Sequence, residues 1–404
     1  MASPLHDVDL PEFDLFDPVF NADPFGTLHR LAAEHRLLST PFGLIVLRYD
    51  DCQAALRKPN LHQGIRLLQD MQGITDERFV SRNRQSILTT EGDAHTRLRK
   101  LVSKAFTPRA TERLRPLMRE VIERLVDPVA PLGRVDFVDA ISEPYPIPII
   151  CALFGAPTED LPQFSRWATD ILKSLGFNLA NDLPAILAAE DEMDRYMEEL
   201  IARRRSEPLD DLLTDLIAAE EAGDRLSHDE LITMAEAIML AGTDTTRNQL
   251  ATGIWLFAQH PEQWALLAAE PERAANAAEE VLRFNGVVRS TIRVAVDEVE
   301  VAGVLVPSGT LIIPSFAAAN RDETYFADPM RFDITRTFER SHLTFGGGIH
   351  YCLGANLARA ELTEALAVLA RRLPGLELDG KATWRPPIGI QGPTSLPIRF
   401  QPGA

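Results

Sequence analysis

The stretch of sequence that decides the fold is Phe345-Gly346-Gly347-Gly348-Ile349-His350-Tyr351-Cys352-Leu353-Gly354. Its consecutive glycines allow backbone conformations with φ above 0° and let a flat partner approach the chain closely. The residues after Cys352 have a helical pattern, which places the cysteine at a helix N-terminus. Unpaired N–H groups and the positive end of the helix dipole stabilise a thiolate there. A thiolate held in this way suits the axial position of a haem iron, so Cys352 is the candidate metal ligand.

An alternative interpretation is a glycine loop before a helix that contains a buried structural cysteine. The complete order Phe-Gly-x-Gly-x-His-x-Cys-x-Gly favours the metal-ligand interpretation, because a glycine-rich loop alone is far less specific. This order resembles the haem-binding loop of the cytochrome P450 family. The resemblance implies haem b as the cofactor, with iron on Cys352. It also implies cofactor contacts from Phe345, Gly346, His350 and Gly354.

Composition limits the class of protein. The chain has 404 residues, 45% of them hydrophobic, as in a globular protein with a large core. Its net charge of −18 argues against a nucleic-acid surface and against an anionic membrane. No apolar run reaches the ~18 residues that span a bilayer, and the N-terminus lacks a signal pattern. We therefore expect a cytoplasmic protein, and expect Cys52 and Cys151 in the core.

The pattern along the chain predicts mostly helices. Ser227 and Glu230 form a capping box that opens a long helix ending near Gln259. Other helices are predicted at 24–35, 94–106, 116–129 and 185–205, and residues 60–90 are expected to form an irregular binding segment. Strand patterns occur mainly at 38–48, 291–314 and 375–400. The prediction is one α+β domain over 1–404, mainly α with a minor β region, and the resemblance implies the triangular cytochrome P450 fold.

The middle of the long helix carries a second motif, Ala241-Gly242-Thr243-Asp244-Thr245-Thr246. Glycine and threonines oppose helix propensity, and the Thr245 hydroxyl can bond to the carbonyl of Ala241. Gly242 would let a planar cofactor lie against the helix, and Asp244 with Thr245 would relay protons. The alternative is a kinked core helix with a solvated aspartate. The motif resembles the family's oxygen-activating segment, which favours Asp244 and Thr245 as catalytic and Ala241 and Gly242 as cofactor contacts.

Four basic residues match the positions at which the family binds the haem propionates. His95 and Arg99 are four apart on one helical face, Arg293 is on a strand-like segment, and His350 is two residues before the cysteine. Arginine and histidine suit carboxylates, so we expect propionate contacts. For any one of them alone, a solvated surface charge would be the simpler explanation.

Glu280, Arg283 and Arg336 match a structural triad of the family. On a surface helix, an acid and a base three residues apart would contribute little. The resemblance implies a buried pair that holds the irregular segment around Arg336, with no part in the chemistry.

The resemblance implies a monooxygenase that inserts one atom of O2 into a C–H bond. The chain has no further cysteines for an iron–sulfur cluster, so electrons are expected from a separate ferredoxin and its reductase. Four basic residues form a candidate docking patch for this donor: Arg97, Lys100, Lys104 and Arg109. The alternative is that they are ordinary solvated charges. We expect a monomer. The alternatives are a hydrogen-peroxide-dependent peroxygenase and a non-catalytic haem protein.

The substrate is expected to be a medium-sized hydrophobic molecule, such as a terpenoid, steroid, fatty acid or polyketide. The candidate pocket residues match the family's pocket-lining regions and are Ile238, Ala241, Val288, Arg289 and Ile390. Val287 stands where relatives often have proline, and Arg289 is charged where they are usually apolar. Our hypothesis is that Arg289 anchors a carboxylate of the substrate.

Overall fold

The computed structural model describes residues 2–157, 161–176, 178–222, 226–386 and 389–402. Their contacts form two compact units that alternate along the chain. The first contains the chain up to Gly73, Leu282–Phe332 and Arg336–Cys352, and the second contains Ile74–Val281, Asp333–Thr335 and the chain from Leu353 onward. Each unit is described by itself, and the expected single domain stays a prediction.

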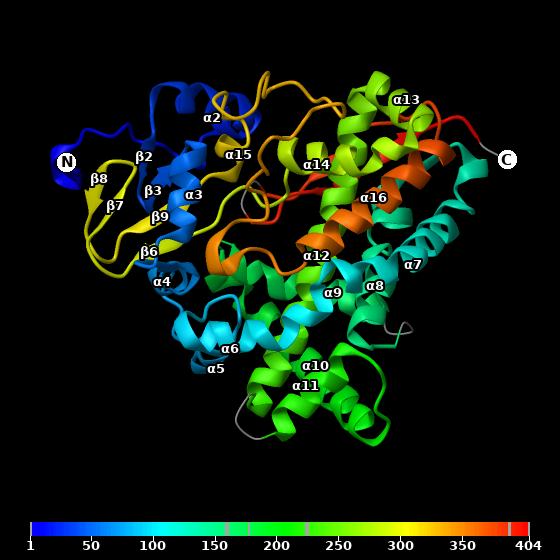
Figure 1. The fold of residues 1–404 in the computed structure, drawn as a ribbon, viewed down its shortest axis with the longest axis horizontal. Coiled ribbons are helices and arrows are strands. Elements are labelled where there is room, and N and C mark those ends of the chain that lie inside the picture. The colour runs from blue at the N-terminus through cyan, green and yellow to red at the C-terminus, as the bar shows by residue number, and fades with distance from the viewer. Residues whose placement is uncertain (1, 158–160, 177, 223–225, 387–388, 403–404) are drawn as a thin grey trace. The chain divides into compact units, whose positions relative to one another are not determined.

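The first unit contains a five-stranded sheet in the order β2-β3-β9-β6-β4. Its strands are β2 (Leu37–Thr40), β3 (Gly43–Val46), β4 (Leu61–Gln63), β6 (Arg293–Ala295) and β9 (Leu311–Pro314). Strands β3 and β9 are parallel, with Leu44 beside Ile312, and the other pairs are antiparallel. A smaller sheet has the order β1-β8-β7, with β1 (Ser3–Pro4), β7 (Val299–Val301) and β8 (Val304–Val306). Helix α3 (Tyr49–Arg57) lies beside the larger sheet (Figure 1).

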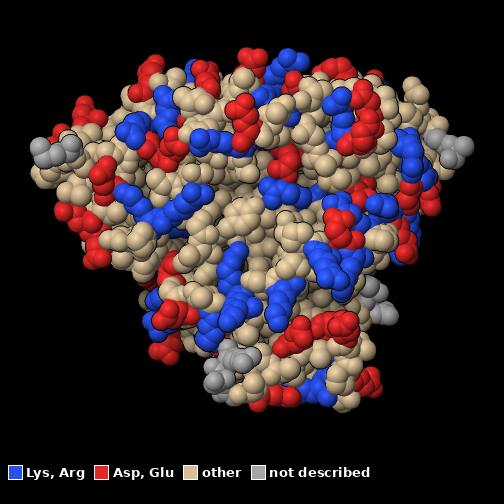
Figure 2. Space-filling view, in the orientation of Figure 1, with Lys and Arg blue, Asp and Glu red and all other residues tan. Residues whose placement is uncertain are grey.

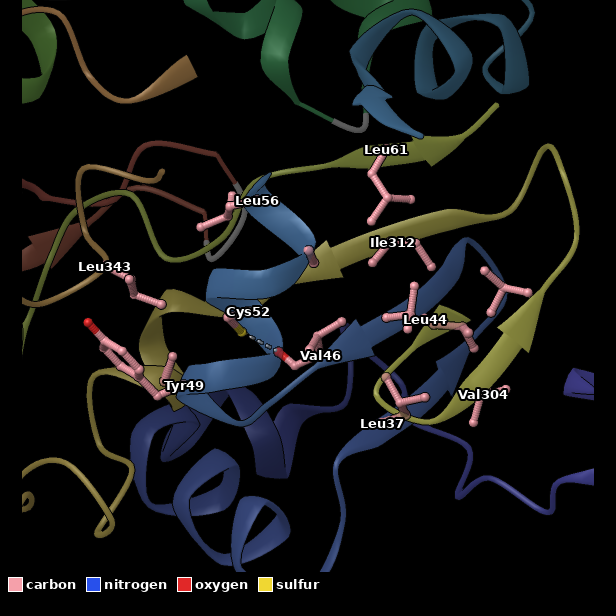
Figure 3. Packing of buried hydrophobic residues seen from close by; sticks show 14 of the residues in the cluster. Leu37, Leu44, Val46, Tyr49, Cys52, Leu56, Leu61, Val304, Ile312 and Leu343 are labelled. Carbon is pink, nitrogen blue, oxygen red and sulfur yellow. Dashed lines mark hydrogen bonds between the residues drawn. The ribbon is translucent and has the colours of Figure 1, made fainter. Parts of the chain in front are cut away.

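Side chains from α3 and both sheets form one apolar core (Figure 3). Cys52 lies within it, fully buried, and its thiol donates to the carbonyl of Val46 at 3.2 Å. Burial raises the pKa of this thiol, so it stays protonated and unreactive. Cys151 is also fully buried. The prediction that both cysteines are core residues is confirmed.

The second unit is built around α12 (His228–Gln259). Ser227 and Glu230 form the predicted capping box, and the helix ends at the predicted residue. With 32 residues it is about 48 Å long. The other helices of eight or more residues in this unit are α5 (Glu77–Gln85), α6 (Gly92–Val102), α7 (Pro108–Val126), α8 (Pro146–Phe154), α9 (Leu161–Ile171), α10 (Leu179–Ser206), α11 (Leu212–Glu221), α13 (Pro261–Ala269) and α16 (Ala355–Arg372).

The remaining elements are shorter or belong to the first unit. Helix α14 (Ala274–Phe284) runs from the second unit into the first. The first unit also has α1 (Pro18–Ala22), α2 (Pro24–Glu34), α4 (Ile65–Met71), α15 (Phe316–Ala319) and the short η1 (Leu5–Asp7) and η7 (Gly348–His350). The second has η2 (Ser103–Phe106), η3 (Ala130–Leu132), η4 (Val138–Ser142), η5 (Leu172–Leu175) and η6 (Pro271–Arg273).

The second unit also contains the expected C-terminal strands. Strands β10 (Glu377–Leu378), β13 (Pro397–Arg399) and β5 (Arg134–Asp136) form one sheet, and β11 (Thr383–Trp384) pairs with β12 (Pro393–Ser395). The predicted class, mainly α with a minor β region, is confirmed. Among the helices that the structure describes, none is long and apolar enough to cross a membrane.

Two predicted helix boundaries are wrong, and proline explains both. Helix α7 begins at Pro108 and contains Pro116, whereas the sequence predicted a start at Pro116. Helix α10 begins at Leu179 and contains Pro184, where a loop was predicted. Proline favours the first turn of a helix, but packing of the flanking turns can hold it further inside.

The segment 60–90, predicted to be irregular, contains β4, α4 and α5. Strand β4 pairs with β6 in the first unit. Helix α5 is capped by Asp76, whose carboxylate accepts from the N–H of Phe79 at 3.0 Å. The elements are short and rich in polar residues, so their periodicity is weak in the sequence.

Candidate functional site

The loop that carries Cys352 owes its shape to two of its three glycines. Gly346 and Gly348 have φ of +70° and +67°, whereas Gly347 is extended. A side chain on Gly348 would lie 2.1 Å from the Leu56 carbonyl oxygen, so the loop can pack here only as glycine. The N–H of Cys352 donates to the carbonyl of Phe345 at 2.9 Å. This bond closes the loop and leaves Cys352 exposed.

The other predicted cofactor contacts of this loop lie on both sides of Cys352 in the sequence. Phe345 and His350 are half-buried, and His350 ends the short helix η7. Gly354 is the N-cap of α16, which begins at Ala355, three residues after Cys352. The predicted helix after the cysteine is confirmed, with its start moved by two residues.

Helix α12 presents Ala241, Asp244 and Thr245 in different environments. Ala241 is exposed and Thr245 half-buried, whereas Asp244 has no exposed surface. The Thr245 hydroxyl donates to the carbonyl of Ala241 at 2.8 Å, which confirms the predicted bond. Its oxygen can still accept a hydrogen bond from another group.

Asp244 is held by two arginines, which the sequence did not predict. Arg385, after β11, donates to both carboxylate oxygens at 2.8 Å. Arg247, one turn further along α12, donates through Nε at 2.8 Å. Asn248 adds a longer bond at 3.3 Å. The solvated aspartate of the alternative interpretation is therefore not what the structure has, because Asp244 is a buried carboxylate fixed by charged donors.

Arg247 connects this aspartate to two further elements. Its guanidinium donates to Glu143, beyond η4, and to the hydroxyl of Thr169 in α9 at 3.0 Å. Arg247 is 5% exposed, so these partners compensate for the burial of its charge. The network fixes the position of the Asp244 carboxylate from several directions.

Gly242 has a packing role that the sequence did not reveal. A Cβ on Gly242 would lie 2.6 Å from Cδ1 of Ile150, so the missing side chain lets α8 approach α12 closely. The residue was predicted to make room for the cofactor, and that contact stays a prediction.

The expected propionate ligands divide between the two units. His95 is buried and Arg99 half-buried in α6, in the second unit. Arg293 is in β6 and His350 in η7, in the first unit. Arg293 is 3% exposed and donates to the Thr291 hydroxyl at 3.2 Å and the Ile292 carbonyl at 3.1 Å. All four provide N–H groups suited to carboxylates.

The triad expected to be structural has the contacts of such a role. Glu280 accepts from the N–H of Asp333 at 3.0 Å, and Arg283 donates to the carbonyls of Asn320 and Pro329 at 2.9 Å. Arg283 and Arg336 both donate to the carbonyl of Arg331, at 3.3 and 3.1 Å. Because these bonds reach backbone groups of the irregular segment, the two arginines fix its course.

The candidate pocket residues differ in exposure. Ile238 is buried, Ile390 is half-buried, and Val288 packs against the core of the first unit. The guanidinium of Arg289 lies 4.7 Å from the ring centre of Phe25 in α2, and its Nε is buried without a hydrogen-bond partner. Burial lowers the pKa of Arg289 to about 10. Its stacking on Phe25 gives Arg289 a partner other than the substrate carboxylate of our hypothesis.

One buried acid was missed entirely. Glu361 in α16 is 1% exposed and accepts from the Thr246 hydroxyl at 3.3 Å. Burial raises the pKa of Glu361 well above its ordinary value. Glu361 is four residues from the buried Leu357 and Ala365, so helical spacing was the signal that could have placed it on the buried face.

The expected docking patch is smaller than predicted. Arg97 donates to the Glu230 carboxylate at 3.0 Å, so much of its charge is neutralised within the second unit. Lys100, Lys104 and Arg109 are exposed. Lys and Arg side chains gather over the part of one face where α6 is drawn (Figures 1 and 2).

Residues 54–379 match the family model described as cytochrome P450. The chain belongs to this family, and it is a cytochrome P450 monooxygenase.

Two bacterial proteins, a monooxygenase and a hydroxylase, are similar to this chain. The chain is 38% identical over 396 residues to luteothin monooxygenase of Streptomyces thioluteus, covering 97% of this chain and 96% of the relative. It is 40% identical over 316 residues to 6-deoxyerythronolide B hydroxylase of Saccharopolyspora erythraea, covering 77% of each. Among solved structures, CalO2 superposes with a TM-score of 0.91 at 32% identity, covering 98% of this chain and all of CalO2.

The cofactor of the family is haem b, and the residues present fit it. Cys352 offers an exposed thiol on a loop that glycines hold in a conformation open to few other residues. Basic side chains suit its two carboxylates, and the predicted ligands are His95 and Arg99 in the second unit and Arg293 and His350 in the first.

Proposed function

We propose that this monooxygenase hydroxylates a polyketide-type small molecule, with Cys352 as the iron ligand and Asp244 and Thr245 as the proton-handling pair. The observation that carries the proton-handling part is the arrangement on α12. There a buried carboxylate, held by Arg385, adjoins a hydroxyl that is fixed by its bond to Ala241. A peroxygenase or a passive haem carrier would not need such a pair.

The haem supplies activation of dioxygen for insertion of one oxygen atom into a C–H bond. The chain's residues hold it: the Cys352 thiolate binds the iron, and His95, Arg99, Arg293 and His350 bind the carboxylates. Phe345, Gly346 and Gly354 shape the loop on either side of the thiolate. Ala241 is also a proposed cofactor contact, and it is exposed on α12.

Protons are handled by Asp244 and Thr245. Arg247 and Arg385 hold the Asp244 carboxylate by donating hydrogen bonds to it from charged groups. To take up a proton, the carboxylate has to give up at least one of these bonds. Arg385 is the better candidate to move, because its side chain is 22% exposed, whereas that of Arg247 is 6% exposed and has other partners. Thr245 then passes the proton on through its hydroxyl.

The polyketide class is supported by the relatives. One of them is named for polyketide biosynthesis, PksS of Bacillus subtilis, and is 34% identical to this chain over 397 residues. The candidate pocket residues Ile238, Ala241, Val288 and Ile390 are apolar, which suits a hydrophobic polyketide skeleton.

A spin-state titration of the purified ferric protein tests the substrate class. The panel contains polyketide macrolactones, terpenoids, steroids and fatty acids, each titrated while the Soret band is recorded. We expect a polyketide to shift the Soret band with the lowest dissociation constant of the panel. Tighter binding of a steroid or terpenoid than of any polyketide would overturn the proposed class.

The iron ligand is tested by replacing Cys352 with serine. The reduced protein treated with carbon monoxide should show the far-shifted Soret band of a thiolate complex, and Cys352→Ser should lose it. Cys52→Ser and Cys151→Ser are the matched controls, since both thiols are buried. A band that survives in Cys352→Ser would overturn the assignment.

Electron supply is the remaining part of the proposal. Lys100, Lys104 and Arg109 give α6, η2 and the start of α7 exposed positive charge, which suits an acidic ferredoxin. A monomeric state and a cytoplasmic location stay predictions.

A further inference from the structure

Helix α5 is fastened to two other helices through one arginine. Arg82 donates through Nη1 to both carboxylate oxygens of Asp194 in α10, at 2.9 and 3.0 Å. Its Nε lies 3.6 Å from Glu190 in the same helix, and its Nη2 contacts the carboxylate of Glu236 in α12. One guanidinium therefore joins three carboxylates from two helices, all within the second unit.

Two further contacts hold α5 to α10. Phe79 is 1% exposed and packs with Leu179 and Ile186 of α10. Arg78 pairs with Asp191, and both side chains are more than half exposed. The exposed pair contributes little, so Phe79 and Arg82 are the main attachments.

The charges around Arg82 do not balance. Glu190 is 5% exposed and Glu236 is 3% exposed, so two carboxylates are buried beside a single guanidinium that also binds Asp194. The Oε1 atom of Glu236 is buried without a hydrogen-bond partner. Buried charges without full compensation are destabilising, so a proton on one carboxylate would relieve the cluster.

Glu190 is the carboxylate best placed to take that proton, because its contact with Arg82, at 3.6 Å, is the longest of the three. Burial, opposed by the charge of Arg82, raises the pKa of Glu190 to about 7. The charged groups that face it are Arg78 and Arg82 of α5, Asp191 and Asp194 on its own helix, and Glu236 of α12.

We propose that Arg82 is a positioning residue that latches α5 onto α10 and α12, and that a proton on Glu190 tightens this latch. Helix α5 lies in the segment expected to border the substrate, so the role of the latch in ligand access rests on the proposed function. The latch itself is a property of the second unit and can be measured without a substrate.

The direction of the pH effect follows from proton linkage. We call the arrangement with α5 held on α10 and α12 the closed state. The closed state favours protonated Glu190, because the pKa of Glu190 is raised above its ordinary value near 4.5. Stabilisation of the closed state is full below that ordinary value and is lost as the pH rises through about 7. Opening of α5 is therefore more frequent at pH 8 than at pH 6.

Hydrogen–deuterium exchange of the holoprotein tests the latch. Amides of residues 74–90 are followed at pH 6 and pH 8 after correction for intrinsic exchange rates. In Arg82→Gln we expect exchange more than about tenfold faster, because two buried carboxylates lose their partner. Arg82→Lys keeps the charge but not the fork, and should be intermediate. Glu190→Gln should remove the pH dependence seen in the parent.

Arg166→Gln is the matched control, because the Arg166–Glu192 pair also involves α10 but not α5. The latch is overturned if Arg82→Lys matches the parent, if Arg82→Gln changes exchange no more than the control, or if Glu190→Gln keeps the pH dependence. Arg82→Lys keeps the test valid if the glutamine variant does not fold.

The role in ligand access is measured separately, from the association rate of 4-phenylimidazole, followed by the Soret shift. Faster association in Arg82→Lys than in the parent supports it. An unchanged rate together with faster exchange leaves the latch standing and overturns the access role. Failure of the polyketide screen would affect neither readout.

Discussion

At the residue scale, neighbouring side chains on α12 have opposite environments. Asp244 is buried and bonded to two arginines. Thr245 is half-buried, and its hydroxyl donates to the carbonyl of Ala241 in the preceding turn. Successive residues of a helix point about 100° apart, so one dipeptide can be fixed by the protein on one side and remain accessible on the other. A proton relay requires both properties.

Replacement of Thr245 tests its part in the relay. In Thr245→Ala we expect reductant consumption to continue while hydrogen peroxide replaces most of the product, because oxygen is activated without ordered proton delivery. The measurement is the ratio of product and peroxide to reductant consumed. Thr243→Ala is the matched control, since that hydroxyl is buried and bonds to Met239 at 3.1 Å. Parent-like coupling in Thr245→Ala would contradict the relay.

His228 is predicted to give the protein a pH-dependent contact. Its ring nitrogens lie 2.9 Å from Glu198 in α10 and 2.8 Å from Glu220 in α11. The bond to Glu198, followed by that to Glu220, raises the pKa of His228 despite partial burial. The stabilisation is therefore full below the ordinary value near 6.5 and is lost as the pH rises through the raised value.

We expect His228→Gln to destabilise the protein at pH 5.5 and to have little effect at pH 9. The side chain is 39% exposed, so the effect should stay below about 1 kcal/mol. Urea unfolding at both pH values measures it. Glu198→Gln should reduce the same pH dependence, and an equal loss at both pH values would contradict the assignment.

At the element scale, the approach of α8 to α12 depends on Gly242. We expect Gly242→Ala to destabilise the protein by about 1–3 kcal/mol, because the new methyl group would overlap the side chain of Ile150. Ile150→Ala removes the obstacle, so the double variant should cost less than the sum of the two single changes. Thermal unfolding of the three variants measures this coupling. Additive costs would show that the overlap is not the cause.

Proline also acts at this scale. Pro116 and Pro184 lie inside α7 and α10, although the sequence predicted helices that start at Pro116 and directly after Pro184. Helix α7 packs along α16, where Arg115 and Arg119 both bind Glu364. Such contacts hold a helix together across a missing backbone hydrogen bond, and local sequence signals do not include them.

At the scale of the whole molecule, the net charge of −18 would oppose binding of the acidic electron donor that we propose, unless a local basic patch attracts it. We expect reduction by an acidic [2Fe–2S] ferredoxin to slow as ionic strength rises, because exposed lysines attract it. Lys100→Glu with Lys104→Glu should lower the second-order rate by about tenfold at low salt. Stopped-flow reduction measures the rate.

Lys381→Glu is the control for total charge, since Lys381 is also exposed. Equal losses in the control and in the double variant would show that net charge, and not the patch, sets the rate. Arg97→Gln should affect stability more than reduction, because Arg97 already binds Glu230.

The sequence by itself determined the family, the candidate iron ligand, the capping box and ends of α12, and the bond from Thr245 to Ala241. Each of these depends on residues close together in the chain, where backbone geometry fixes the contacts. Only the tertiary structure showed that Arg385 holds Asp244, that Ile150 fills the space at Gly242, and that Arg82 gathers carboxylates from two helices. These partners are far apart in the sequence, and packing alone brings them together.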